Sequence, residues 1–165
     1  IDSSYTRMKY LAENVMTSSK NGIIARLGNV YGFGMSRSNV LSRLLEQIEL
    51  QGDLRVTDTV PIRDFIWVED VVNGILSLAL AEFRDFGDRR IYNLGTGIGT
   101  SIGELARLVL EIAGQTERHV VSEIQTTRES SVILDFSDIS RACGWAPSTS
   151  LRSGINQLLN VGREG

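Results

Sequence analysis

Tyr5 and Lys9 form a pair whose residue types and spacing could carry out proton transfer. They stand four residues apart in a segment with helical periodicity, so both side chains leave the same face of a helix about one turn apart. A phenol titrates near pH ~10, and using it as a base near neutrality requires lowering its pKa by about three units, or roughly 4 kcal/mol. A lysine ammonium supplies part of that stabilisation, and an oxidised, positively charged nicotinamide ring would supply more. By spacing alone, the pair is also compatible with a solvated helix face.

The rest of the sequence alternates between helical and strand patterns. In residues 5–16 the apolar side chains of Met8, Leu11, Ala12 and Val15 recur on one helical stripe. We expect helices over residues 5–16, 39–50, 69–82, 101–113, 137–143 and 150–161, and strands over residues 22–27, 54–57, 65–68, 91–94 and 120–124. Strands that alternate with helices predict an α/β fold in which at least part of the sheet is parallel.

Composition and charge exclude several classes of protein. The chain has 165 residues, of which 42% are hydrophobic and 22% charged, and this balance is typical of a globular domain with a real core. Its formal charge of -3 leaves no basic face for a nucleic acid. The single cysteine, Cys143, and the single histidine, His119, lack partners with metal-site spacing, so we expect no metal, no disulfide and a reducing cytoplasm. No apolar run is long enough to span a membrane.

Six segments in order resemble the signature segments of the extended short-chain dehydrogenases/reductases, in particular the NAD-dependent epimerases and dehydratases of nucleotide-sugar metabolism. They are SYTRMK at 4–9, ARLGNVYG at 25–32, IRDFIWVEDV at 62–71, IYNLGTG at 91–97, DISRA at 138–142 and GWAPSTSL at 144–151. Together they cover nearly the whole chain, which makes a chance match of the Tyr and Lys pair a poor explanation.

The resemblance implies a role for each matching residue near the reaction centre. Tyr5 is the catalytic acid/base, and Lys9 lowers its pKa while hydrogen-bonding the nicotinamide ribose. Asn29 contacts the substrate, and the segment from Leu27 to Val30 approaches the nicotinamide through its backbone. Asn29 follows a predicted strand, and ligands of open α/β sheets bind beyond the carboxyl ends of strands. The alternative for Asn29 is an asparagine that only satisfies a turn.

Two arginines match positions that bind a nucleotide diphosphate in nucleotide-sugar members of the family. The forked guanidinium of Arg63 suits a diphosphate better than a lysine would, and its structural alternative is a salt bridge with Asp64 or Glu69. Arg128 stands where relatives carry a second phosphate-binding arginine, but serines at 130–131 replace the usual Gly-Asp that follows.

Other departures concern the identity of the substrate more than the class of reaction. The loop from Leu54 to Pro61 is shorter than the family pattern, and Phe33 replaces a proline. The glycines at 95–99 do not fit a dinucleotide-binding fingerprint. The position that requires the third glycine is occupied by Ile102, and no acidic residue follows at the required distance. We interpret the glycines as a strand-to-helix turn that leads into a capping box at residues 101–104.

The sequence therefore predicts the carboxyl-terminal part of a Rossmann-like doubly wound α/β fold plus a small substrate-binding α/β subdomain, as a single fragment over residues 1–165. The amino-terminal, dinucleotide-binding half is absent from it, so we expect the chain alone to be inactive. The resemblance implies NAD, or NADP, as cofactor, a nucleotide sugar as substrate, and a homodimer of the full-length enzyme through the helix that carries Tyr5 and Lys9. Two alternatives stay open: a non-catalytic binding or interaction module, and a reductase of a non-nucleotide substrate.

Overall fold

A computed structural model of the chain describes residues 4–19, 22–82, 90–124 and 130–161, without the side chains of residues 5 and 161. Its helices are α1 (Ser4–Thr17), α2 (Val40–Ile48), α3 (Val68–Leu80), α4 (Ile102–Ala113), α5 (Ser137–Cys143) and α6 (Leu151–Val161). Its strands are β1 (Ile24–Leu27), β2 (Asn29–Tyr31), β3 (Leu54–Val56), β4 (Ile62–Trp67), β5 (Ile91–Leu94), β6 (Gly99–Ser101), β7 (Val120–Ser122) and β8 (Ser131–Val132).

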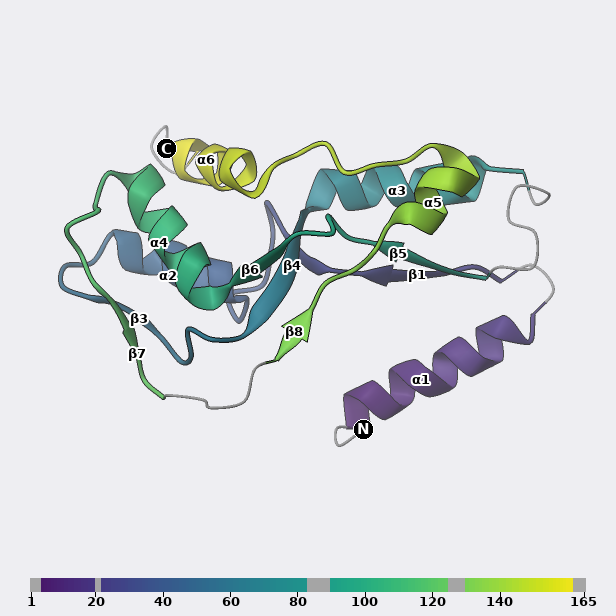
Figure 1. The fold of residues 1–165 in the computed structure, drawn as a ribbon, viewed down its shortest axis with the longest axis horizontal. Helices are drawn as coiled ribbons and strands as arrows, with labels where there is room; N and C mark the ends of the chain where they lie inside the picture. The colour runs from purple at the N-terminus through teal and green to yellow at the C-terminus, as the bar shows by residue number, and fades with distance from the viewer. Residues whose placement is uncertain (1–3, 20–21, 83–89, 125–129, 162–165) are drawn as a thin grey trace.

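The strands pair mostly in parallel, as the alternation of elements predicts. β1 pairs with β5, β2 with β4, β3 with β7 and β8 with β4, all parallel, whereas β4 and β6 are antiparallel. Figure 1 shows α2, α4, β3 and β7 at one end of the molecule and β1, β5, α3 and α5 at the other, with β4 crossing between them. β4 is therefore the strand that connects the two ends.

Two apolar cores lie on the two faces of β4. Phe65 and Trp67 point into one core, together with buried side chains of α2, β3, α4 and α6. Ile66 points to the opposite face, where it meets buried side chains of α3, β5 and α5. This division follows from the alternation of side chains along a strand.

A buried carboxylate ties α3 to the segment that leads into α6. Asp70 accepts hydrogen bonds from the backbone N–H of Ser148 at 3.2 Å, from its hydroxyl at 2.7 Å, and from the N–H of Thr149 at 2.9 Å. The indole of Trp145 donates to the backbone carbonyl of Asp70 at 3.1 Å. These contacts hold the carboxyl-terminal part of the chain over both cores.

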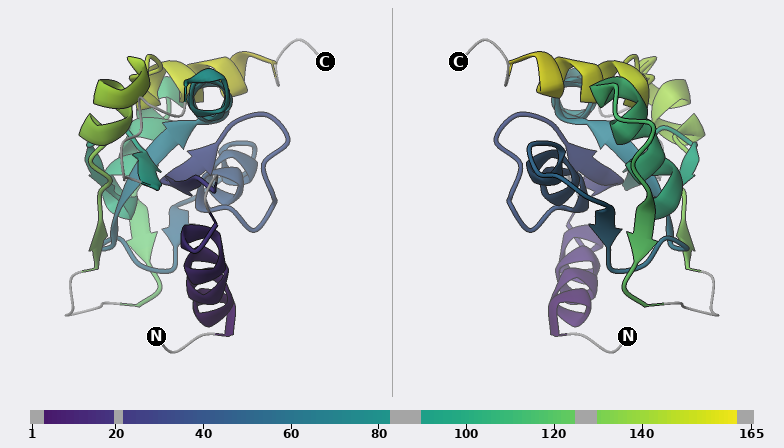
Figure 2. Two further views of the ribbon diagram at one scale, coloured as in Figure 1. Left: turned by 90° about the vertical axis from the view of Figure 1, so that its right-hand side faces the viewer. Right: turned by 90° about the vertical axis from the view of Figure 1, so that its left-hand side faces the viewer.

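α1 stands apart from the other helices. It packs alongside β1 and projects away from the rest of the molecule in both views of Figure 2. A forked ion pair joins it to the strand, with Arg26 Nε and Nη2 at 3.0 and 2.6 Å from the carboxylate of Glu13. The predicted apolar stripe of this helix is solvent-exposed, with Met8 at 70% and Val15 at 71% of their accessible surface.

The predicted helices are all present, with ends shifted by a few residues. The capping box is also confirmed, because Ser101 and Glu104 exchange hydrogen bonds at the start of α4. No pattern in the sequence predicts β2, β6 or β8, which have only two or three residues each. β4 begins three residues before the predicted strand, because the hydrogen bonds of Asp64 allow a carboxylate to be buried inside it. The glycine run at 95–99 leads into β6 rather than directly into a helix.

No helix among the described residues has the length and apolar character needed to cross a membrane.

Gly154 tests the packing of α6 on the first core. A Cβ added there would lie 2.8 Å from Tyr31 Cε2 and 2.9 Å from Trp67 Cε3, and both rings are buried. Gly154→Ala should therefore lower the free energy of unfolding by about 1 to 3 kcal/mol, although alanine normally stabilises a helix interior by up to about 1 kcal/mol. Thermal denaturation checks this, with the exposed neighbour substitution Ser153→Ala as control. A melting temperature for Gly154→Ala at or above that of the control would contradict the packing.

Candidate functional site

The pairing of β2 with β4 places Asn29 and Arg63 on one face of the sheet. Asn29 is the register partner of Phe65, so Arg63, two residues earlier on β4, projects to the same side. Val30 pairs with Ile66 and projects to the opposite side. Two of the predicted site residues are thus brought together by strand register.

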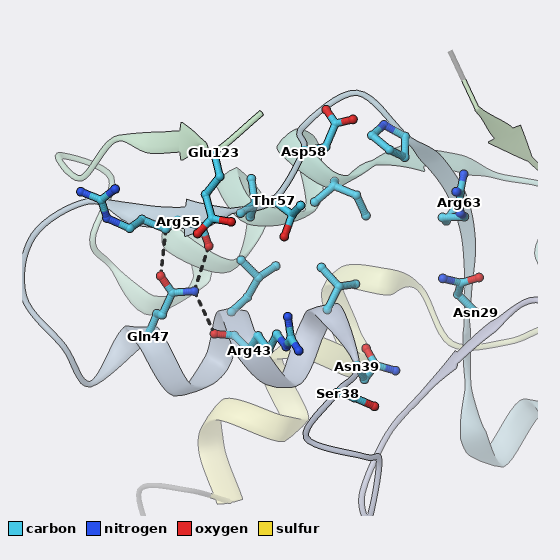
Figure 3. Close-up of a pocket in the computed structure, with 15 residues that line it drawn as sticks. Asn29, Ser38, Asn39, Arg43, Gln47, Arg55, Thr57, Asp58, Arg63 and Glu123 are labelled. Carbon is cyan, nitrogen blue, oxygen red and sulfur yellow. Dashed lines mark hydrogen bonds between the residues drawn. The ribbon is translucent and has the colours of Figure 1, made fainter. Parts of the chain in front are cut away.

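Asn29 and Arg63 line one end of an elongated cavity of about 770 Å³ between α2, β3 and β4. Figure 3 shows Asn29 and Arg63 at one end, Arg43 along the floor, and Arg55 and Glu123 at the other end. The lining residues are Asn29, Ser38, Asn39, Val40, Arg43, Leu44, Gln47, Arg55, Val56, Thr57, Asp58, Pro61, Arg63, Ile102 and Glu123. The cavity has the size of a small-molecule site, and apolar and charged side chains both line it.

One face of α2 supplies the polar floor of this cavity. Asn39, Arg43 and Gln47 are spaced by four residues and therefore lie above one another along the helix. Asn39 is also the N-cap, because its Oδ1 accepts from the N–H of Leu41 at 2.9 Å. Its Nδ2 donates to the carbonyl of Val30 at 3.2 Å, which fixes the start of the helix beside β2.

Gln47 links the other end of α2 to β3. Its Oε1 accepts from the N–H of Arg55 at 2.8 Å, and its Nε2 donates to the Arg55 carbonyl at 3.0 Å. The same Nε2 donates to the carbonyl of Arg43 at 3.1 Å. With both ends of α2 anchored, the walls of the cavity are held at a fixed separation.

The hydrogen bonds of Arg63 leave part of its guanidinium for a ligand. Nη1 donates to the carbonyls of Ile62 at 2.7 Å and Ser130 at 2.8 Å. Neither the carboxylate of Asp64 nor that of Glu69 forms an ion pair with it among the described residues, so the salt-bridge alternative is wrong. Arg63 Nε and Nη2 are free of hydrogen bonds to the described residues.

Asp64, the next residue on β4, projects to the opposite side and is buried. Its carboxylate accepts from the N–H of Thr96 at 2.9 Å, the hydroxyl of Thr96 at 2.6 Å, and the N–H groups of Gly97 and Leu134, both at 3.1 Å. The glycine turn after β5 is thus filled by a carboxylate of the protein itself. This agrees with the prediction that the turn is no dinucleotide site.

The charged groups around the cavity indicate what a ligand must supply. Among the described residues, none accepts a hydrogen bond from the guanidinium of Arg43 or Arg55, and none donates to the carboxylate of Glu123. Arg63 at one end and Arg43 along the cavity favour an anionic group such as a phosphate. A carboxylate at the other end favours a hydrogen-bond donor.

The remaining predicted site residues lie elsewhere or outside the described part. Lys9 is carried by α1, which Figure 1 shows apart from α2 and β3, two of the elements that line the cavity. Leu27 ends β1 and does not line the cavity, and Val30 lines a smaller cavity of about 360 Å³. The side chain of Tyr5 and the whole of Arg128 lie outside the described residues.

Other ionisable groups have structural roles. Burial raises the pKa of Tyr31 well above its ordinary value, and the nearby Asp70 carboxylate adds to the shift, so this phenol is unsuited to act as a base. Cys143 packs in the second core and donates to the carbonyl of Ile139 at 3.3 Å, and His119 is exposed. The described residues contain no group of metal-binding side chains.

Eight charged or polar residues that line the cavity were not predicted from the sequence: Ser38, Asn39, Arg43, Gln47, Arg55, Thr57, Asp58 and Glu123. The four-residue spacing of Asn39, Arg43 and Gln47 could have predicted that Arg43 and Gln47 lie on one face of a helix. Arg55 and Glu123 had no such signal, because only the pairing of β3 with β7 brings their segments together.

The glycine turn after β5 does not offer the N–H groups of Thr96 and Gly97 to the pyrophosphate of a dinucleotide. A site for that pyrophosphate requires free backbone N–H groups at a glycine turn or helix N-terminus. The glycine turn at 95–97 is the candidate in this chain, and Asp64 already occupies its N–H groups.

Comparison with known proteins gives consistent matches over most of the chain. The model of the NAD dependent epimerase/dehydratase family matches residues 2–95. The dTDP-L-rhamnose 4-epimerase of Burkholderia thailandensis is 31% identical over 145 residues, which are 82% of this chain and 38% of that protein. The curated relatives are covered over 38% to 48% of their length, so the chain spans about half or less of each.

Solved structures agree. RMD from Pseudomonas aeruginosa, complexed with NADPH, superposes with a TM-score of 0.82 at 26% identity, over 94% of this chain and 55% of that one. The UDP-glucose 4-epimerase of Thermotoga maritima, solved with UDP-glucose, gives a TM-score of 0.71 at 26% identity, over 97% of this chain and 52% of that one. The α/β fold of the chain therefore matches about half of each of these structures.

Asp64→Asn tests the contribution of the buried carboxylate. The substitution replaces an acceptor by an amide N–H₂ that faces backbone N–H groups, so the free energy of unfolding should fall by about 1.5 to 3 kcal/mol. Urea denaturation measures the loss, and Asp53→Asn, at an exposed position, is the matched control. Equal urea midpoints for the two variants would show that the carboxylate does not hold the turn.

Proposed function

The chain belongs to the NAD-dependent epimerase/dehydratase family, and from this premise we propose that it is the substrate-binding part of a nucleotide-sugar epimerase or dehydratase. The observation that carries the proposal is the cavity between α2, β3 and β4, with Asn29 and Arg63 at one end. We propose that this cavity binds the nucleoside diphosphate and that the sugar extends beyond Asn29.

The arrangement of cations supports this placement of the diphosphate. Arg63 Nε and Nη2 donate to none of the described residues, and Arg43 projects from α2 into the same cavity. Guanidinium groups bind phosphate oxygens through paired N–H donors. The apolar side chains of Val40, Leu44 and Val56 offer a surface for a flat base.

The chemistry of the proposed reaction would depend on α1. Tyr5 and Lys9 lie one turn apart on that helix, where the phenol of Tyr5 would take the proton of the sugar hydroxyl and the Lys9 ammonium would stabilise the phenolate. NAD or NADP would serve as hydride acceptor, and residues outside this chain would hold its pyrophosphate. A cofactor site outside this chain agrees with the fraction of each relative that the chain covers.

Exposed apolar surfaces support the need for further polypeptide. Besides the stripe on α1, α3 exposes Leu76 at 51% and Leu80 at 82% of their accessible surface. β1 forms a two-stranded sheet with β5, and such a small parallel sheet normally continues into further strands. We propose that the dinucleotide-binding half covers these surfaces, and the homodimer through α1 stays a prediction for the complete enzyme.

One observation favours a second function for the chain by itself. Described residues line the cavity for the nucleoside diphosphate, whereas the pyrophosphate of the dinucleotide is proposed to bind outside this chain. A binding module without turnover is therefore the alternative, and it shares the nucleotide site with the first proposal.

Arg63→Ala tests the nucleotide site in this chain. The substitution removes a charge-assisted contact, so the affinity for nucleoside diphosphates should fall ten- to a hundredfold, corresponding to about 1.5 to 3 kcal/mol. Calorimetric titration with GDP, UDP, CDP and dTDP measures it, and Arg152→Ala, on the outer face of α6, is the control. Unchanged affinity together with a lower melting temperature would assign Arg63 a structural role only.

Tyr5→Phe tests the reaction in the complete enzyme. Removing the phenolic oxygen should lower kcat by a factor of about 10² to 10⁴, because proton transfer contributes on that order, while substrate affinity stays nearly unchanged. Steady-state kinetics with a nucleotide-sugar substrate provides the measurement. Activity within about threefold of the parent enzyme would rule out Tyr5 as the acid/base.

A further inference from the structure

We infer that Glu123 reads the base of the bound nucleotide and selects guanine, an inference that rests on the proposed nucleotide site. Glu123 directly follows β7 and lines the end of the cavity opposite Asn29 and Arg63. If the diphosphate lies at Arg63, the base lies at this opposite end.

The backbone of Glu123 is held firmly against β3. Its N–H donates to the carbonyl of Val56 at 2.9 Å, which continues the parallel pairing of β3 with β7. The next residue, Ile124, donates to the carbonyl of Thr57 at 2.9 Å. The position from which the carboxylate enters the cavity is thus fixed by the sheet, although the side chain itself is exposed.

The amide of Gln47 and the carboxylate of Asp58 already have partners, whereas the carboxylate of Glu123 has none among the described residues. Gln47 uses its amide on the backbone of α2 and β3. Asp58 accepts from the N–H of Val60 at 3.0 Å. No ion pair joins Glu123 to the adjacent Arg55 in the described part of the chain. Glu123 is therefore a charged acceptor at this end that a ligand can use.

The pattern of donors on the bases makes guanine the best match for a carboxylate. Guanine presents N1–H and an N2 amino hydrogen side by side, so the two carboxylate oxygens can each accept one hydrogen bond. Uracil and thymine present a single N3–H between two carbonyl oxygens, which the carboxylate repels. Cytosine and adenine present one amino group beside a ring nitrogen that is itself an acceptor. Only guanine offers two adjacent donors.

The base is a property that the relatives leave open. Two of the proteins compared above carry different bases in their names, dTDP in the Burkholderia enzyme and UDP in the Thermotoga enzyme. Residues of this chain at the base end of the cavity must therefore decide the preference.

The test is a calorimetric comparison of GDP, UDP, CDP and dTDP on the chain and on Glu123→Gln. We expect the parent chain to bind GDP about tenfold or more tightly than UDP, as loss of a hydrogen bond to a charged group implies. Glu123→Gln should lower the affinity for GDP by about tenfold or more and change that for UDP by less than about threefold. The control Glu46→Gln, on α2 and outside the cavity, should leave both unchanged.

The outcomes separate this inference from the proposed function. Binding of all four nucleotides with similar affinity, or a GDP preference that survives Glu123→Gln, would overturn the role of Glu123 while leaving the nucleotide site intact. Failure of every nucleotide to bind would overturn the proposed site and this inference with it. Because the Glu123 side chain is exposed, the parent and the variant should have equal melting temperatures. Equal values would exclude misfolding as the cause of a lost GDP preference.

Discussion

The buried carboxylate of Asp64 joins three segments that are distant in the sequence. It accepts hydrogen bonds from the turn at Thr96 and Gly97 and from Leu134, while the strand that carries it runs between the two cores. A buried charge is tolerable only when donors surround it, so this geometry constrains all three segments at once. Because side chains alternate along β4, the same constraint presents Arg63 on the opposite side. The stability of the sheet and the placement of Arg63, the arginine proposed to bind the diphosphate, thus depend on neighbouring residues of one strand.

The cavity follows from that strand and from the anchoring of α2. Asn39 fixes the start of α2 to β2, and Gln47 fixes its end to β3, so the helix lies at a defined distance from Arg63. The side-chain amides of Asn39 and Gln47 are both used in these hydrogen bonds to the backbone. The charged groups of Arg43 and Glu123 are left for a ligand, which explains why the proposed site has cations toward one end and an acceptor at the other. Its selectivity would then come from side chains that contribute little to the fold.

Much of the fold was predictable, because its longer elements have clear periodicity. The capping box of Ser101 and Glu104 predicts the start of the helix at residues 102–113. The alternation of helices and strands predicts the parallel arrangement. The shortest strands carry too few residues for a periodic signal, and β4 was underestimated because Asp64 breaks its apolar pattern. In the site, Asn29 and Arg63 were identified by resemblance. Glu123 could not be, since its place in the cavity results from the pairing of β3 with β7, a contact between segments more than sixty residues apart.

The central claim, that the cavity between α2, β3 and β4 binds a nucleoside diphosphate, can be tested most directly by nuclear magnetic resonance. Titrating the isotopically labelled chain with GDP should shift the backbone amides of Asn29, Arg63, Glu123 and α2, because these groups surround the cavity. The amides of α1 and α3 should stay unchanged. Shifts confined to α1, α3 or the turn at Thr96 and Gly97, with none along α2, would contradict the account.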